Sequence, residues 1–267
     1  RATRAQAVDA VNIELVAGGD IGQSTLPMTV KTAVDGAVRN ASAGGSAYLS
    51  SPVGVLTVLN GGATTGQMAL NGSAAGLTLG GNITTGRGLA LTAGSNAISL
   101  TADAALTNGT GSTVMQGKTV TMADGATVDG GAGTVVLSAT GDITLTGLRS
   151  ANNSSGAIVV SSTGGAILDG GETNADLTVS SASGAVVLSA LGSVGDSALA
   201  AGGRLDQALH DVACARLLEV QAHVGHVVGR QGPCNLDRCY HVDFAREADG
   251  QKMNWFLQPV LVLPLPS

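Results

Sequence analysis

The chain copies itself at an interval of 23 residues across its middle, and this repeat restricts the fold more than any other feature. Residues 135–139 (VVLSA) return 23 positions later as residues 158–162 (IVVSS). Residues 141–145 (GDITL) return at the same interval as residues 164–168 (GGAIL). A period of roughly 20 to 50 residues is typical of stacked units that bury their apolar faces only against one another.

Each copy contains two or three short stretches of alternating apolar and polar residues, which predict strands separated by turns of small residues. Residues 120–122 (VTM) extend the pattern, since they lie 23 positions before residues 143–145. Asn-Gly and Gly-Gly pairs supply the positive φ angles of the turns. They are Asn60-Gly61, Asn71-Gly72, Gly80-Gly81 and Asn108-Gly109.

Because equivalent residues recur at a fixed interval, the sequence predicts an all-β fold over residues 1–200, a right-handed parallel β-helix (β-solenoid). The expected coils are 19–23 residues long, with Val160 above Val179 at 19 residues and Leu168 above Leu188 at 20. Eight or nine such coils, at the ~4.8 Å spacing of paired strands, predict a stack of about 40 Å. An antiparallel β-sandwich remains an alternative, since Asn-Gly turns also suit hairpins.

The composition agrees with a thin aliphatic core. Hydrophobic residues make up 44% of the chain but aromatic residues only 2%, so the interior must be filled by Val, Ile, Leu and Ala. Disorder is disfavoured, because it requires few apolar residues and a high net charge. The net charge of −6 and the lack of a basic stripe argue against a nucleic-acid partner. No apolar run approaches the roughly 18–20 residues of a membrane-spanning helix.

The sequence changes character at about Ala201. All four His, all three Cys, the Trp and both Phe follow this point. Residues 204–228 carry apolar side chains near helical spacing, so the tail (residues 201–267) is expected to be partly helical or poorly ordered. A copy of residues 17–26, displaced by 173 positions, stops at Leu199. The tail is therefore either a separate small module or not the native continuation, as after a shifted reading frame or a fusion.

Three short segments that contain Gly and Asp resemble the repeats of a known family. Residues 141–146 (GDITLT), 19–22 (GDIG) and 192–197 (GSVGDS) resemble the repeats of filamentous-haemagglutinin-like exoproteins, which are bacterial adhesins exported by two-partner or autotransporter routes. The resemblance covers roughly residues 10–200 and none of the tail. It implies a β-helical shaft on the bacterial cell surface (associated with the outer membrane) or in secreted form, binding a host-cell or matrix receptor or glycan. The family's secretion domain is not visible, which leaves the export route open.

Gly/Asp-rich β-rolls bind calcium through a nonapeptide with Asp in its sixth position. Residues 130–135 come nearest but place Val135 there, and no tandem copies follow. The acids of the repeat are instead expected to bond the local backbone in turns. They are Asp124, Asp129, Asp169 and Asp176.

Catalysis was weighed because some polysaccharide-cleaving enzymes are β-helices. Asp142 and Asp169 lie 27 positions apart, near one coil, and are the candidate carboxylate pair. Aromatic platforms for sugar rings are lacking in the repeat, and the cations Arg87, Lys118 and Arg149 are isolated. The sequence therefore predicts no enzyme and no cofactor, with a carbohydrate-active lyase or hydrolase as the alternative.

The tail contains weak candidates for a metal site, Cys234, Cys239 and His241, with His223 and His226 upstream. The spacing of the two cysteines is permitted for zinc, but a histidine two positions past a cysteine is awkward. Unpaired thiols are the simpler interpretation, and we expect no metal.

These observations predict a structural or adhesive shaft segment of a larger bacterial surface or secreted protein. Its expected partners are further repeats of the same longer chain and a surface receptor or glycan. A truncated or frame-disrupted repeat without its own activity is the remaining alternative.

Overall fold

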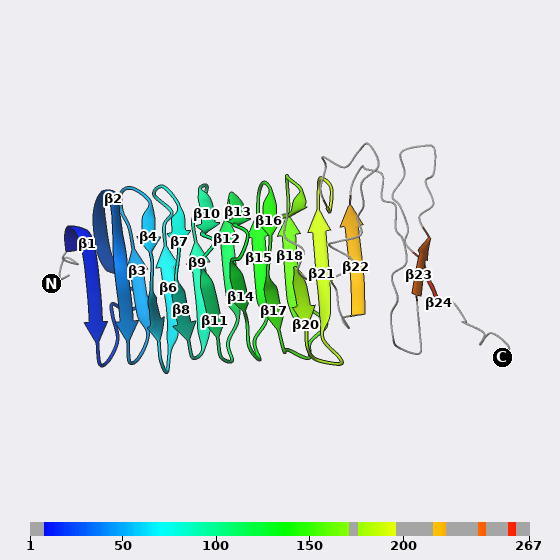
Figure 1. Ribbon diagram of the computed structural model, residues 1–267, viewed down its shortest axis with the longest axis horizontal. Coiled ribbons are helices and arrows are strands. Elements are labelled where there is room, and N and C mark those ends of the chain that lie inside the picture. Colours follow the sequence, from blue (N-terminus) through cyan, green and yellow to red (C-terminus); the bar gives the residue numbers. More distant parts are fainter. Residues whose placement is uncertain (1–7, 171–175, 196–215, 223–239, 244–255, 260–267) are drawn as a thin grey trace.

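The computed structural model describes residues 8–170, 176–195, 216–222, 240–243 and 256–259. Within these ranges the chain contains strands and no helix. The strands stack in parallel as a β-solenoid of about seven turns (Figure 1). The β-solenoid prediction is therefore confirmed, and the antiparallel sandwich is wrong, since every strand pair from β1 to β22 is parallel.

Each regular coil contributes one strand to each of three ladders. Ladder 1 contains β3 (Ala47–Ser50), β6 (Gln67–Asn71), β9 (Gly88–Thr92), β12 (Thr113–Gly117), β15 (Val135–Ala139), β18 (Ile158–Ser162) and β21 (Ala185–Ala190). Ladder 2 contains β4 (Leu56–Val58), β7 (Leu77–Leu79), β10 (Ala97–Leu100), β13 (Thr119–Met122), β16 (Ile143–Leu145) and β19 (Ile167–Asp169). Ladder 3 contains β5 (Gly61–Ala63), β8 (Asn82–Thr85), β11 (Ala105–Asn108), β14 (Thr127–Asp129), β17 (Leu148–Ser150) and β20 (Leu177–Val179).

The first coils are built differently. Strand β2 (Met28–Ala43) is long enough to pair with β3, β4 and β5 in turn, so one strand serves all three ladders. Strand β1 (Val8–Ala17) pairs with β2 and lies at the end of the stack (Figure 1). The register of β1 and β2 shifts after Ala10, where β2 bulges and Asp35 adopts a φ of 62°.

The 23-residue register is confirmed in the middle of the stack and fails toward its end. Val135 pairs with Ile158 and Val120 with Ile143, as expected. Ile143, however, pairs with Ile167, one position beyond the interval. In the next coil the spacing grows, since Ile158 pairs with Val186.

The expected late pairs, Val160–Val179 and Leu168–Leu188, are wrong. Val160 pairs with Leu188 on ladder 1, whereas Val179 pairs with Ser150 on ladder 3. The connection between β17 and β18 is long, as is that between β19 and β20, and these connections take up the additional residues. Longer coils over the same length of chain give about seven turns instead of eight or nine.

The core lies between the ladders and consists of aliphatic columns. Strand residues alternate between buried and partly exposed, so every second side chain points inward. One inward column of ladder 1 is at most 2% exposed throughout. Its members are Leu49, Leu70, Leu91, Met115, Leu137, Val160 and Leu188. Burying each such side chain contributes about 1.5–3 kcal/mol, so the stack is stabilised rung by rung.

Part of the tail prediction is wrong. Strand β22 (Arg216–Ala222) lies within the predicted helix 204–228 and pairs in parallel with β21. The free edge of β21 offers backbone hydrogen bonds, and these favour an extended chain over the helical pattern of the segment. The other residues of the predicted helix lie outside the described residues. Strands β23 (Tyr240–Asp243) and β24 (Phe256–Pro259) form a separate antiparallel pair.

Candidate functional site

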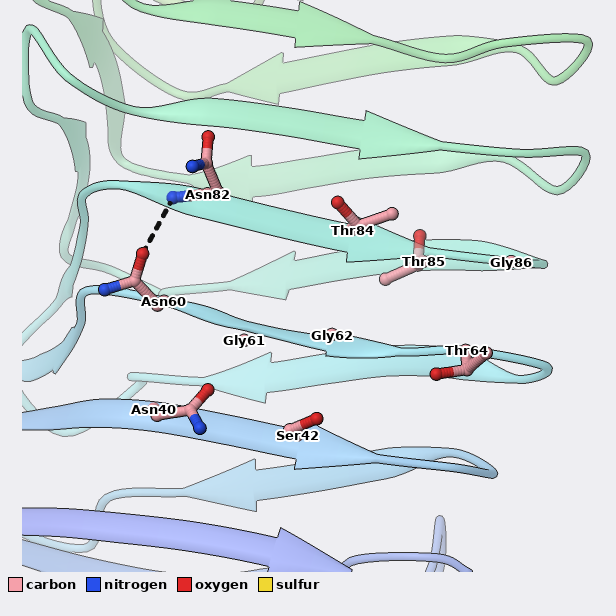
Figure 2. Close-up of a pocket in the computed structure, with 10 residues that line it drawn as sticks. All are labelled: Asn40, Ser42, Asn60, Gly61, Gly62, Thr64, Asn82, Thr84, Thr85 and Gly86. Atoms are coloured by element: carbon pink, nitrogen blue, oxygen red, sulfur yellow. Dashed lines mark hydrogen bonds between the residues drawn. The ribbon is translucent and has the colours of Figure 1, made fainter. Parts of the chain in front are cut away.

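A shallow groove of about 460 Å³ is a candidate site. It lies on the outer surface of ladder 3, across the end of β2, β5 and β8 (Figure 2). Its lining is Asn40, Ser42, Asn60, Gly61, Gly62, Thr64, Asn82, Thr84, Thr85 and Gly86. The groove therefore joins residues from three consecutive coils.

The asparagines of the groove are aligned by the strand register. Ala41 pairs with Gly61, and Gly61 with Ile83, so the preceding residues Asn40, Asn60 and Asn82 form one column. Asn60 Oδ1 accepts a hydrogen bond from the backbone N–H of Asn82 at 3.1 Å (Figure 2). Asn60 Nδ2 donates to the carbonyl oxygen of Arg39 at 3.4 Å. This side chain thus links three rungs.

The two glycines of β5 form the floor of the groove. A Cβ built on Gly61 would lie 2.5 Å from the carbonyl oxygen of Ala41, and one on Gly62 would lie 2.5 Å from that of Thr84. Both distances are too short for a carbon atom beside backbone. Any larger residue would have to displace a neighbouring rung, so the hollow depends on these glycines.

The lining offers amide and hydroxyl groups but no ionisable side chain. Such groups donate and accept hydrogen bonds in several directions, which suits a hydroxyl-rich ligand. General acid–base catalysis requires a titratable group near the reacting atoms. The arrangement therefore supports weak polar contact and supplies no acid or base.

The Gly-Asp-Ile segments of the sequence proved to be links between coils. Asp20 Oδ1 accepts a hydrogen bond from the backbone N–H of Ser46 at 2.7 Å, and Asp142 Oδ1 accepts one from Ala166 at 2.8 Å. In both cases the donor belongs to the next coil and lies immediately before a strand, since Ser46 precedes β3 and Ala166 precedes β19. Turn roles were expected for acids, but the reach to the next coil was not.

A glycine in the next coil makes room for each of these carboxylates. A Cβ on Gly45 would lie 2.0 Å from Asp20 Oδ1, and a Cβ on Gly165 would lie 2.4 Å from Asp142 Oδ1. The signal was present in the sequence as a Gly-Gly pair about one coil after each Gly-Asp. Repeats of this kind therefore encode stacking of one turn on another.

The structure does not bring Asp142 and Asp169 together as a catalytic pair. Ile143 pairs with Ile167 and Leu145 with Asp169. Asp142 therefore lies immediately before β16, whereas Asp169 is the last residue of the neighbouring strand β19. Three residues along a strand correspond to about 10 Å. Asp169 lies in line with the inward residue Leu145 and is half-buried, whereas Asp142 is exposed.

The remaining acids occupy turns and ladder ends. Asp129 Oδ1 accepts a hydrogen bond from the backbone N–H of Gly131 at 2.8 Å, as predicted for a turn residue. Asp124 is exposed between β13 and β14. Asp176 is 3% exposed, and its backbone carbonyl accepts a hydrogen bond from Leu148 at 2.7 Å.

Asp103 is the acid of the described residues whose titration is shifted by its surroundings. The Thr101 hydroxyl donates a hydrogen bond to the Asp103 carboxylate, and backbone N–H groups of Asp103 and Gly81 add to it. These bonds favour the charged form and lower the pKa of Asp103 below its ordinary value of 3.8. Asp103 lies in the turn between β10 and β11, so the bonds stabilise that turn.

The glycines of segment 130–135 are explained by close packing of turns. A Cβ on Gly133 would lie 1.7 Å from the carbonyl oxygen of Gly111, and one on Gly131 would lie 2.2 Å from that of Asn108. Gly131 also has a φ of 54°. These positions must therefore be glycine, because the adjacent turn of the neighbouring coil leaves no room for a Cβ atom.

The cations of the repeat do not converge. Arg87, Lys118 and Arg149 are exposed at separate corners and strands. Within the described residues one ion pair is present, between Lys31 Nζ and Asp9 Oδ2 at 2.9 Å, and it joins β1 to β2.

The metal candidates of the tail fall almost entirely outside the described residues. These are Cys234, Cys239, His223 and His226. His241 lies in β23 and pairs with Gln258 of β24. In the described part of the chain, no group of three or more His, Cys, Asp or Glu side chains is placed to hold a metal ion.

Comparisons with protein-family models, curated proteins and solved structures found no match. The described residues also contain no helix of the length and apolarity needed to cross a membrane. Fold and surface chemistry are therefore the basis for a functional proposal.

Proposed function

We propose that this chain is a non-catalytic shaft segment of a bacterial surface-exposed or secreted filamentous adhesin. The observation that carries the proposal is the unbroken parallel stack from β3 to β21, in which three ladders enclose one aliphatic core. Continuous hydrogen bonding along the stack resists bending and stretching. A rod of this kind can hold a binding region away from a cell.

The groove on ladder 3 supports an adhesive contribution. Its amide and hydroxyl lining suits hydrogen bonding to a glycan or another hydroxyl-rich receptor. An open, uncharged groove gives weak contacts, but repeated engagement of many molecules on one surface multiplies such contacts. Adhesion is therefore proposed to depend on valency.

Surface labelling of cells that produce the protein tests the proposal. Antibodies against residues 8–195 are expected to label intact cells or their shed filaments, and beads coated with the chain are expected to adhere to host cells or matrix. Labelling that requires lysed cells, or beads that adhere no better than uncoated beads, would count against the shaft and its adhesive role respectively.

An assay on polysaccharides tests the non-catalytic part. The full chain is expected to release no reducing ends or unsaturated sugars from a panel of acidic and neutral polysaccharides. Turnover that is lost in an Asp142→Asn variant would establish an enzyme instead.

A further inference from the structure

The outer surface of ladder 1 carries no charged side chain, and unlike that of ladder 2 it is apolar along one column. None of its seven strands, β3, β6, β9, β12, β15, β18 and β21, contains Asp, Glu, Lys or Arg. Ladder 3 includes the charged residues Asp129 and Arg149. The outward residues of ladder 2 are uncharged as well, but from β4 to β16 one of their columns consists of hydroxyl residues, namely Thr57, Thr78, Ser99, Thr121 and Thr144. We refer to the outward side chains of the seven strands of ladder 1 as the charge-free face.

One column of the charge-free face is apolar along its whole length. The strand register aligns the seven residues of this column. Ala90 is exposed and the other six are half-buried. In order along the stack they are Tyr48, Ala69, Ala90, Val114, Val136, Val159 and Val187. A largely aliphatic stripe that ends in Tyr48, on the surface of a chain with a net charge of −6, is a candidate interaction surface.

The neighbouring outward column is polar and uncharged. Its members are Ser50, Asn71, Thr92, Gln116, Ser138, Ser161 and Ser189. Hydroxyl and amide groups can pair with one another when a second surface covers them, which removes the cost of burying them. Arg87 and Lys118 are exposed at the edges of the face, where charges stay hydrated as in the rim of an interface.

We propose that the charge-free face binds a second copy of this chain, with the two stacks running in opposite directions. Two negatively charged molecules repel each other, and on this ladder they can meet over an apolar column without facing or desolvating an acid. The face is also self-complementary, as a two-fold symmetric interface requires.

Side-chain size selects the antiparallel arrangement. The two residues on one side of its midpoint are the alanines Ala69 and Ala90, and the two on the other side are the larger Val136 and Val159, whereas the ends of the column are Tyr48 and Val187. A two-fold axis parallel to the strands and passing at Val114 places Val136 opposite the partner's Ala90 and Val159 opposite the partner's Ala69. At these positions the larger residue fills the space left by the smaller one, as in a well-packed core. The same axis keeps the polar column opposite the polar column.

The extent of the face indicates a reversible dimer. Seven strands at ~4.8 Å spacing and about five residues at ~3.3 Å each cover roughly 500 Å² on each partner. The total of about 1,000 Å² is near the lower limit for a specific interface. The inference goes beyond the proposed shaft function, and each can fail without the other.

Sedimentation equilibrium of the full chain over a range of concentrations tests the dimer. A shift from 26.1 kDa to twice that mass is expected as concentration rises. Val114→Glu places two carboxylates together at the axis, and it is expected to weaken the dimer by about a hundredfold. Thr121→Glu is the matched control, and it is expected to leave the dimer unchanged. Thr121 belongs to the same coil as Val114 but is an outward residue of β13 on ladder 2.

Crosslinking keeps the proposal testable should Val114→Glu fail to fold. In a chain with Cys214, Cys234 and Cys239 replaced by Ser, Val114→Cys is expected to crosslink to its own copy through a short bismaleimide. Val187→Cys is expected not to, since it faces the partner's Tyr48. A monomer at all concentrations, equal effects of the two Glu substitutions, equal crosslinking at both positions, or open-ended assembly would each overturn the proposal.

Discussion

Ladders 1 and 3 belong to the same coils yet hold successive rungs together by different means. The inward columns of ladder 1 are mostly aliphatic. In ladder 3 the second inward column instead includes small polar residues, with Thr85, Asn108 and Ser150 all at most 2% exposed.

The polar residues of ladder 3 serve the turns that follow it. Thr85 Oγ1 donates to Asn108 Oδ1 at 3.1 Å, and Asn108 Nδ2 donates to the carbonyl oxygen of Gly111. Ser150 Oγ donates to the carbonyl oxygen of Gly133 at 2.8 Å. Buried backbone groups of a tight corner need partners, and these side chains supply them. Sheets of the stack are thus stabilised by apolar burial, and this corner by side-chain hydrogen bonds.

The largest expected effect comes from weakening ladder 1. Leu137 is fully buried between Met115 and Val160, so Leu137→Ala leaves a cavity and is expected to cost about 2–5 kcal/mol of unfolding free energy. Urea unfolding followed by circular dichroism measures it. Leu191→Ala is the control, since Leu191 is 54% exposed, and a change within about 0.5 kcal/mol is expected there. Equal losses at both sites would contradict the aliphatic-core account.

The next effect tests the corner of ladder 3. Asn108→Ala removes the partner of the Thr85 hydroxyl and of the Gly111 carbonyl, and it is expected to cost about 1–3 kcal/mol by the same assay. Asn96→Ala serves for comparison, because Asn96 makes its 2.9 Å bond to the Ser73 carbonyl at the surface. A loss no greater than that of Asn96→Ala would mean that the buried bonds do not stabilise this corner.

A third change should improve ladder 1. Thr113 lies in an inward column between Leu89 and Val135, and its buried hydroxyl has no hydrogen-bond partner. Thr113→Val keeps the shape and removes that polar group, so it is expected to stabilise the chain by about 1 kcal/mol. Thr134→Val, whose hydroxyl donates to Ser112 Oγ at 2.9 Å, is expected to bring no gain. Destabilisation by Thr113→Val would be the contrary result.

The smallest effect concerns the turn before ladder 3. Because hydrogen bonds lower the pKa of Asp103 below 3.8, its contribution to stability is present above that pH and is lost as pH falls through the folded-state value. NMR titration of the Asp103 carboxyl is expected to show a midpoint below 3.8, and Asp103→Asn should remove this part of the acid dependence. A midpoint at or above the ordinary value would show that the Thr101 bond is not maintained in solution.

Much of the fold could be predicted from the sequence, because alternation and period are local properties. The stretches at 120–122 and 135–139 predicted strands, and their 23-residue interval predicted the parallel neighbours Ile143 and Ile158. The helix predicted for residues 204–228 is wrong within β22. The spacing of apolar residues there carries no information about the free edge of β21, with which β22 pairs.

The candidate groove could not be predicted. Its floor is Gly61 and Gly62, which in the sequence look like an ordinary turn signal. Only the pairing of β5 with β2 and β8 shows that they lie between Asn40 and Asn82. The acids of the repeat were correctly assigned to turns at Asp129, but the bond from Asp142 to the next coil required the neighbouring coil.

The amino-acid pattern is sufficient to predict that this chain forms short strands stacked in parallel around an aliphatic core. Alternation sets which side chains point inward, and a repeat near one coil in length sets which strands become neighbours. The register between coils, and with it the groove, the Asp–backbone links between coils and the charge-free face, becomes visible only in the folded chain. A column is made of residues from different coils, and its alignment depends on how many residues each connection takes up, which Gly- and Ser-rich turns do not encode.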